Sequence, residues 1–249
     1  GQTADATLIA AFAAQTPPIT YADALPGICY SVFVVPPGVA EGFPLFTAII
    51  KGRKVYDPRT TLTVWSDNPA LALADFIVNT TYGWGKTVDY STVITVANEC
   101  DAIVEEPGSS PKRRVFGLTV GAVQPILSWL ETLRTYASCW IVPEGNTMRL
   151  VADRPSAYVA DFLHGSGQIV ELTDLTKRGT MNVPTVMEVV YTDTRTYPWK
   201  DASAIVYADG VLTGTTPRRE SVVALPGIQL HSQAMREATE RLNKLSLSD

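Results

Sequence analysis

Hydrophobic positions in the first quarter of the chain form almost uninterrupted apolar runs, which are typical of strands. Residues 28–35, "ICYSVFVV", are apolar, β-branched or aromatic almost throughout, and a Pro-Pro-Gly turn ends the run. Residues 46–57, "FTAIIKGRKVYD", contain two strand-like pieces separated by Gly52, as at a bulge or a tight turn. We therefore predict strands across residues 19–64.

Two short helices are predicted next, because apolar residues now recur at helical spacing. Asn68 can cap a helix over residues 69–79, since its side chain accepts hydrogen bonds from the first backbone N–H groups, and Pro69 is tolerated in the first turn. A second helix is predicted over residues 92–100, with Ser91 as its cap. The supporting apolar positions are Leu73, Phe76 and Ile77 in the first helix and Val93, Val96, Ala97 and Cys100 in the second.

The clearest helical pattern lies in residues 124–138, "QPILSWLETLRTYAS", where Pro125 suits the first position. Its apolar stripe consists of Ile126, Leu127, Leu130, Leu133 and Ala137. Residues 139–153, "CWIVPEGNTMRLVAD", read as two strands joined by a Glu-Gly-Asn turn, which is the pattern of a hairpin. Because the connection is short, we expect the three leucines of the helix to be buried against this hairpin.

The last third of the chain predicts three more strands and a terminal helix. The strands are residues 168–175, 185–194 and 203–210. The helix, residues 232–245, has an apolar face and two i,i+4 charge pairs on the other face. These positions are Ala234, Ala238, Leu242 and Leu245 on the apolar face and Glu237–Arg241 and Glu240–Lys244 in the pairs. Because helices are grouped between runs of strands, the predicted fold class is α+β.

Residues 105–114, "EEPGSSPKRR", are the most loop-like stretch and the predicted boundary between two parts. Residues 1–104 then form a strand-rich part with two short helices, and residues 115–249 form a helix, a hairpin and further strands closed by the terminal helix. The chain begins at Gly1, and the apolar stripe of its last helix continues almost to its end. We therefore expect a segment of a longer polypeptide, whose next domain packs against or continues this stripe.

Composition and charge argue against several classes of protein. Hydrophobic residues make up 46% of the chain and charged residues 18%, which is the composition of a globular protein. A net charge of −5, with no basic run longer than "KRR", argues against a nucleic-acid-binding surface. No apolar run approaches the ~20 residues of a membrane span, and the first residues lack the basic start of a signal peptide.

Metal and catalytic sites are not indicated by the sequence either. The cysteines and histidines are Cys29, Cys100, Cys139, His164 and His231. They form no C-x-x-C motif and no ligand set at zinc spacing, so we predict buried thiols. Neither histidine has the neighbours of a catalytic triad. The sequence therefore predicts no enzyme, no catalytic residue, no cofactor and no metal.

Residues 80–87, "TTYGWGKT", nearly match a phosphate-binding loop. Lys86 and Thr87 supply the end of the pattern, but Thr80 stands where the first glycine is required. A phosphate-binding loop follows a strand and opens a helix, whereas this stretch follows a predicted helix. We therefore predict a helix stop, with Gly83 and Gly85 at positive φ, and no nucleotide site.

Scattered carboxylates and tryptophans leave a glycan-directed alternative open. Glu105 and Glu106 are adjacent, so their side chains point apart in an extended segment and suit a shared acid–base site poorly. The other carboxylates are Asp153, Asp161, Glu171 and Asp174, and the tryptophans that could stack on sugars are Trp84, Trp140 and Trp199. The alternative function is therefore a glycan hydrolase or a glycan-binding module without catalysis.

Residues 51–60, "KGRKVYDPRT", concentrate basic residues and a tyrosine between a strand and a polar loop. Arginine and tyrosine are frequent in protein interfaces, because a planar cation and a rigid aromatic ring lose little freedom on contact. The candidate assembly interface consists of Lys51, Arg53, Lys54, Tyr56, Asp57 and Arg59. A solvated hairpin end with self-neutralising charge is the alternative interpretation.

Three strings in this region carry a family resemblance. They are "IIKGRKVYDPRT", "WSDNPALALADFIVNTTYGWG" and "VDYSTVITVANECD". In this order they resemble the tail-tip hub proteins of long-tailed, lambda-like phages, the family of tip attachment or host-specificity proteins. The resemblance continues more loosely through "ILSWLETL" and "WIVPEGNTMRLVAD" to the closing helix, from about Asp5 to Leu245.

The resemblance implies a structural protein of the virion, located at the distal end of the tail. Such hub domains assemble as a homotrimeric ring beneath the tape-measure protein, contact other tail-tip proteins, and support host attachment and genome ejection. The receptor-binding end of these proteins lies far C-terminal to this part, so host recognition is not expected here. In that family the "YG-x-G" stretch closes a helix and binds no nucleotide, and no nucleic-acid sequence recognition is implied.

Overall fold

A computed structural model of the protein describes residues 3–23, 32–33, 50–120, 123–154, 183–195 and 197–246. The chain divides into two units, Gly1–Ile50 and Lys51–Asp249. Residues 105–114, where a boundary was expected, therefore lie inside the second unit. The predicted strands at 28–35 and 168–175 fall almost wholly outside the described residues.

The first unit contains helix α1 (Ala6–Ala13), which the sequence analysis did not predict. Asp5 caps it, because its carboxylate accepts hydrogen bonds from the backbone N–H groups of Thr7 and Leu8. Phe12, near the end of the helix, stacks on Tyr21 with ring centroids 5.1 Å apart. The chain therefore folds back on this helix by an aromatic contact.

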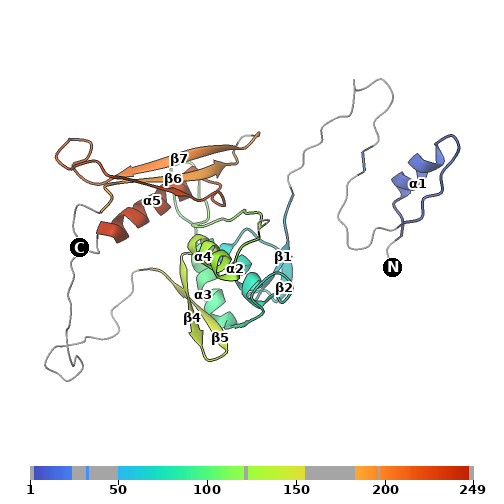
Figure 1. Cartoon of the computed structure of the whole chain (residues 1–249), viewed down its shortest axis with the longest axis horizontal. Helices are drawn as coiled ribbons and strands as arrows, with labels where there is room; N and C mark the ends of the chain where they lie inside the picture. Colours follow the sequence, from blue (N-terminus) through green and yellow to red (C-terminus); the bar gives the residue numbers. More distant parts are fainter. Residues whose placement is uncertain are drawn as a thin grey trace. The chain divides into compact units, whose positions relative to one another are not determined.

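The second unit has the predicted α+β fold (Figure 1). Its elements are β1 (Lys54–Asp57), β2 (Leu62–Trp65), α2 (Pro69–Val78), β3 (Thr87–Val88), α3 (Tyr90–Asp101), α4 (Ile126–Ala137), β4 (Cys139–Glu144), β5 (Thr147–Ala152), β6 (Val186–Asp193), β7 (Lys200–Tyr207), β8 (Glu220–Ala224) and α5 (His231–Ser246). The strands form three small sheets with the orders β1-β2, β3-β5-β4 and β7-β6-β8. Helices α2, α3 and α4 form the predicted cluster of short helices, and α5 is the predicted terminal helix.

The predicted hairpin is confirmed as β4 and β5, which pair antiparallel from Cys139 opposite Ala152 to Glu144 opposite Thr147. A two-residue loop joins them, and its first residue, Gly145, has a φ of 62°. A two-residue hairpin loop of this kind needs positive φ at its first position, which glycine adopts without strain.

The first core is built mainly from helices α2, α3 and α4, with side chains from strands β1, β3, β4 and β5. Asn68 caps α2 as predicted: its side-chain oxygen accepts from the N–H of Ala70 and Leu71. Its side-chain amide also donates to the Ala97 carbonyl of α3, at 2.9 Å, so this fully buried residue joins two helices. The largest fully buried apolar side chains of this core are Leu71, Leu73, Ile77, Val93 and Val96.

Two details of the helix predictions are wrong. Helix α3 begins at Tyr90, so its cap is Asp89, whose carboxylate accepts from the Ser91 N–H. In α4, Leu130 and Leu133 are buried, but Ile126 and Leu127 are 41% and 65% exposed. The reason is that α4 packs mainly against α2 and only briefly against β4, so its first turn extends past the core.

The second core lies between α5 and the sheet β7-β6-β8. Alternate residues of β6 are buried beneath α5, because successive strand side chains point to opposite faces. The buried set is Met187, Val189 and Tyr191 from β6, Ala204 from β7, and Ala234, Ala238 and Leu242 from α5. The predicted strands and helix are confirmed here, and β8 was not predicted. The α5 stripe packs against its own sheet, so its described residues are already covered within this unit.

The two cores are joined by polar contacts of α5 and by Tyr136, the one α4 residue that belongs to the second core. Arg114 bonds to both Glu237 and Glu240 on α5, at 2.8 and 2.6 Å. Val115 exchanges two backbone hydrogen bonds with the buried side chain of Gln233, both 3.1 Å long. Glu237 was expected on the face opposite the apolar stripe, and it is buried there, because it pairs with Arg114 as well as with Arg241.

Candidate functional site

The β1–β2 hairpin carries the predicted interface residues, and its alternation divides them into two sets. Lys54 and Tyr56 are exposed on β1, whereas Val55 and Asp57 are 6% and 7% exposed and face the interior. Because strand side chains alternate, only the first set is available to a partner.

Asp57 and Arg59 belong to an ion-pair network within the chain. The Arg59 guanidinium bonds to Asp57 at 2.8 Å and to Asp101 of α3, also at 2.8 Å. The side-chain bond from Arg59 lowers the pKa of Asp57. Lys112 extends the network to Asp101 and Asp67. The structure therefore gives Asp57 and Arg59 a role in holding the hairpin to α3.

The other four predicted residues are on the outside, where cations lie against aromatic rings. The Lys51 ammonium is 5.0 Å from the ring centroid of Trp65, and the Arg53 guanidinium is 4.8 Å from that of Tyr82. Lys54 pairs with Trp65 in the strand register. We define the hairpin surface as Lys51, Arg53, Lys54, Tyr56, Trp65, Tyr82 and Tyr90.

Several contacts hold the rings of the hairpin surface in place. Tyr56 and Tyr90 meet edge to face with centroids 5.4 Å apart. Asp75 of α2 accepts a bond from the Tyr82 hydroxyl and pairs with Arg53 at 3.3 Å. Burial, and then the bond to Asp75, raises the pKa of Tyr82. The surface is therefore ordered before any partner binds.

The hairpin surface is open and partly apolar. Tyr56, Trp65, Tyr82 and Tyr90 are each between 37% and 42% exposed. All four residues of β2 are exposed, including Leu62 and Val64 on the opposite face of the strand. Among the described strands, β2 pairs only with β1, so no described strand covers its outer edge. Exposed aromatic rings on an edge strand are typical of a contact surface.

Sequence reasoning missed the aromatic half of this surface. Trp65 comes from the partner strand, Tyr82 from the loop after α2, and Tyr90 from the start of α3. The hairpin pattern with a short loop at 58–61 was the one available signal for Trp65. No local pattern indicates Tyr82 or Tyr90, because they reach the surface through tertiary packing.

The near match to a phosphate-binding loop closes a helix, as predicted. The backbone N–H groups of Trp84 and Lys86 donate to the carbonyls of Phe76 and Ile77 at the end of α2, both at 2.9 Å. These N–H groups are therefore engaged and do not converge on a phosphate. Gly85 has the predicted positive φ of 69°, but Gly83 does not. Glycine is needed at position 83 because a Cβ there would lie 2.0 Å from the Phe76 carbonyl oxygen.

The residues considered for catalysis are scattered over the described part of the chain. A ring nitrogen of His231 lies 3.1 Å from the Tyr191 hydroxyl. Glu106 pairs with Arg236, and Asp153 pairs with Lys244. His164, Asp161, Glu171 and Asp174 fall outside the described residues. The structure therefore brings none of the described candidates together.

The tryptophans considered for sugar stacking lie in different settings. Trp84 is half-buried against the first core. Trp140 is 51% exposed on β4 and stacks under Arg134 at 4.6 Å, and Trp199, just before β7, is 43% exposed. No described contact joins the three into one platform.

Metal and thiol chemistry find little support in the described part of the chain. No group of three or more His, Cys, Asp or Glu side chains there could hold a metal ion. Cys100 and Cys139 are buried and free, as predicted, and burial raises their pKa values to about 11 and about 12. Such thiols stay protonated and are poor nucleophiles. Cys29 falls outside the described residues.

Comparison with known proteins adds no relative. No protein-family model matches the chain, and no curated protein matches it. None of the helices in the described ranges has both the length and the apolar character needed to cross a membrane. The candidate site therefore stands on the geometry of the hairpin surface.

Proposed function

We propose that this protein is a structural component of a phage tail tip. In this proposal it forms part of the hub ring at the distal end of the tail tube, in the virion, and supports attachment and genome delivery. The working unit is a homotrimer that also contacts other tail-tip proteins and the tape-measure protein. The role is assembly, without enzymatic chemistry. Support comes from the resemblance of residues 49–101 to that family and from the hairpin surface within the same residues.

The hairpin surface is the observation that carries the proposal. Interface hot spots are enriched in tryptophan, tyrosine and arginine, and this surface combines Trp65, three tyrosines and Arg53. Two of its three cations, Lys51 and Arg53, are held over rings, so little of their side-chain freedom remains to be lost when a partner binds. A ring of identical subunits needs two different patches on each subunit, and the hairpin surface would be one of them.

The proposal is tested in the complete hub protein within the phage. Arg53→Glu combined with Trp65→Ala removes one cation and the central ring of the surface, without touching the first core. We expect loss of ring formation in purified hub, since each ~1.4 kcal/mol of lost contact energy weakens association about tenfold, and we expect a fall in phage titre.

Arg195→Glu is the matched control for this experiment. Arg195 is as exposed as Arg53, with 62% against 60% of its side chain accessible, and it also pairs with one aspartate, Asp193. The control should assemble normally. Unchanged ring formation and titre in the double variant would refute the proposal, provided its thermal unfolding matches that of the control. Loss of sugar binding with normal assembly would favour the glycan-binding alternative.

A further inference from the structure

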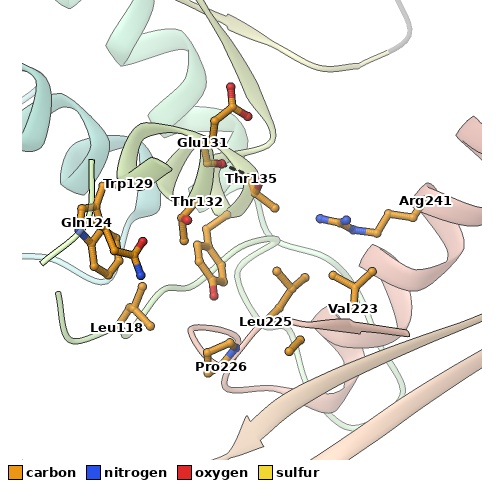
Figure 2. Close-up of a pocket in the computed structure, with 12 residues that line it drawn as sticks. Leu118, Gln124, Trp129, Glu131, Thr132, Thr135, Val223, Leu225, Pro226 and Arg241 are labelled. Carbon is orange, nitrogen blue, oxygen red and sulfur yellow. Dashed lines mark hydrogen bonds between the residues drawn. The ribbon is translucent and has the colours of Figure 1, made fainter. Parts of the chain in front are cut away.

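A groove of about 480 Å³ lies between helix α4 and the end of strand β8 (Figure 2). Its apolar lining is formed by Leu118, Trp129, Leu225 and Pro226. Thr132 and Thr135 also line it, but each hydroxyl already donates to a backbone carbonyl of α4, at 2.9 Å. The groove therefore offers an apolar wall of a size suited to a few side chains.

Arg241 supplies a positioned cation to this groove. Its Nε donates to Glu237 at 2.7 Å, which fixes the side chain on α5. Within the described residues, no bond engages its two terminal nitrogens. Figure 2 shows the guanidinium pointing toward the side chains of Thr135 and Leu225. The terminal N–H groups are thus directed at whatever occupies the groove, in the fork geometry that suits a carboxylate.

The acid on the groove's rim does not compete for this cation. The Glu131 carboxylate pairs with Arg134 at 2.5 Å, and Figure 2 shows it turned away from the other lining side chains. Arg134 in turn stacks on Trp140. Each charged lining residue is thus paired within the chain, Arg241 with Glu237 and Glu131 with Arg134, and the terminal N–H groups of Arg241 remain as donors for an occupant.

The end of strand β8 forms one side of the groove. In the parallel pairing with β6, the Val186 N–H donates to Arg219 and the Leu225 N–H donates to Val190. Odd-numbered residues of this stretch therefore direct their backbone groups toward β6. Val222 and Ala224 consequently direct theirs away from β6, and Ala224 lines the groove. Among the described strands, none pairs with this edge.

We propose that this groove binds an extended peptide segment of another protein by adding it as a strand to β8. The segment carries a carboxylate side chain for Arg241 and an apolar side chain two positions away for the wall formed by Trp129 and Pro226. Side chains two positions apart lie on the same face of a strand, about 7 Å apart. Backbone bonds to Ala224 give affinity, and the two side chains give specificity.

The test is fluorescence anisotropy of the full chain with a labelled peptide, Thr-Val-Thr-Glu-Thr-Val-Thr, which presents the pattern in either strand direction. We expect saturable binding. Replacing the peptide glutamate by glutamine should weaken binding about tenfold, since a charge-assisted bond is lost. Arg241→Gln should weaken binding of the glutamate peptide by about the same factor and leave binding of the glutamine peptide unchanged. Methylating alternate backbone nitrogens of the peptide should abolish binding.

Two protein variants control this measurement. Lys244→Gln removes a cation one turn further along α5, whose partners are Asp153 and Glu240 rather than the groove, and Arg53→Gln removes a cation from the hairpin surface. Both should keep the affinity of the starting protein. The peptide substitutions leave the protein untouched, so they report on binding even if Arg241→Gln unfolds the chain.

Several outcomes would overturn the proposal. They are the absence of saturable binding up to roughly 1 mM peptide, equal binding of the glutamate and glutamine peptides, and loss of binding in Arg53→Gln. Binding of an acidic oligogalacturonate that depends on Arg241, with no peptide binding, would make the groove a glycan site instead. The groove shares no residue with the hairpin surface, so its failure would leave the assembly proposal standing.

Discussion

The two cores of the second unit are held together by different forces. The first core joins three helices through apolar side chains and one buried amide, Asn68. The second core is also apolar inside, but its junction with the first depends on charged and polar groups of α5, above all the pairs of Arg114. Cohesion within each core is therefore hydrophobic, whereas the junction between the cores combines charged and polar contacts of α5 with the buried ring of Tyr136. Solution conditions and single substitutions should therefore affect the interior of each core differently from the junction between the cores.

The largest effect is expected at the junction. Arg114→Met removes the cation that faces both Glu237 and Glu240, and Glu237 is 7% exposed. Glu237 then keeps only its bond to Arg241, and Glu240 keeps only its bond to Lys244. Removing one partner of a buried ion pair is strongly destabilising, so we expect a loss toward the lower end of ~3–5 kcal/mol in the free energy of unfolding, measured by urea denaturation. Arg149→Met is the matched control, because Arg149 is 45% exposed and its pairs should contribute less than about 1 kcal/mol. Equal effects of the two changes would mean that the junction is not electrostatic.

A slightly smaller effect is expected inside the first core. Leu130 is 4% exposed, so Leu130→Ala should lower the free energy of unfolding by ~2–5 kcal/mol through lost burial and the cavity that remains. Leu127 lies on the same helix but is 65% exposed, so Leu127→Ala should change it by less than about 0.5 kcal/mol. The pair is compared by thermal or urea unfolding. If Leu127→Ala lowers the free energy of unfolding as much as Leu130→Ala does, the first turn of α4 is buried rather than exposed.

The smallest expected effect is a pH dependence of the unfolding free energy, which charged groups give to the junction but not to the apolar cores. Burial alone would raise the pKa of Glu240, but Arg114 and Lys244 lower it by more than burial raises it. The pKa of Glu240 is therefore below its ordinary value of 4.5. A carboxylate whose pKa is lowered by folding stabilises the fold above its unfolded pKa, and this contribution is lost as the pH falls through the folded pKa. Acid should therefore weaken the junction below about pH 4.5.

Glu240→Gln tests this dependence, since glutamine cannot titrate. The difference in unfolding free energy between the starting protein and Glu240→Gln should shrink as the pH falls from about 6 to about 3. A difference that stays constant over this range would show that Glu240 contributes through packing rather than charge. Leu130→Ala is the comparison variant. Its effect on the unfolding free energy involves no titrating group, so this effect should stay constant over the same pH range.

Local patterns predicted the elements whose signals lie within a few residues. Asn68 and Pro69 marked the start of α2, the Gly145 turn marked the hairpin, and the stripe of α5 marked its buried face. Strand β8 was missed, because five residues with a weak alternation pair in parallel with a strand 34 positions earlier, Glu220 with Val186. Tertiary packing, which no local window contains, decided both the exposure of Leu127 and the burial of Glu237.

The candidate site was predictable only in part for the same reason. The run from Lys51 to Arg59 was visible as a cluster of basic and aromatic residues, but strand alternation turned Asp57 inward, and Arg59, in the turn after β1, bonds to it. The rings that complete the surface come from three other elements. The Arg241 groove left no trace in the sequence, since Arg241 looked like half of an ordinary i,i+4 helix pair.

The bonds between Gln233 and Val115 make this glutamine side chain a substitute for a peptide group. One side-chain oxygen accepts from the Val115 N–H while the side-chain nitrogen donates to the Val115 carbonyl, as a neighbouring strand would do. Glutamate could accept but not donate, lysine could donate but not accept, and asparagine is one methylene shorter. At a position only 2% exposed, water cannot replace the missing half. Helix α5 therefore recognises the main chain of residue 115 through the side chain at position 233, and these two bonds do not depend on the identity of the buried side chain at 115.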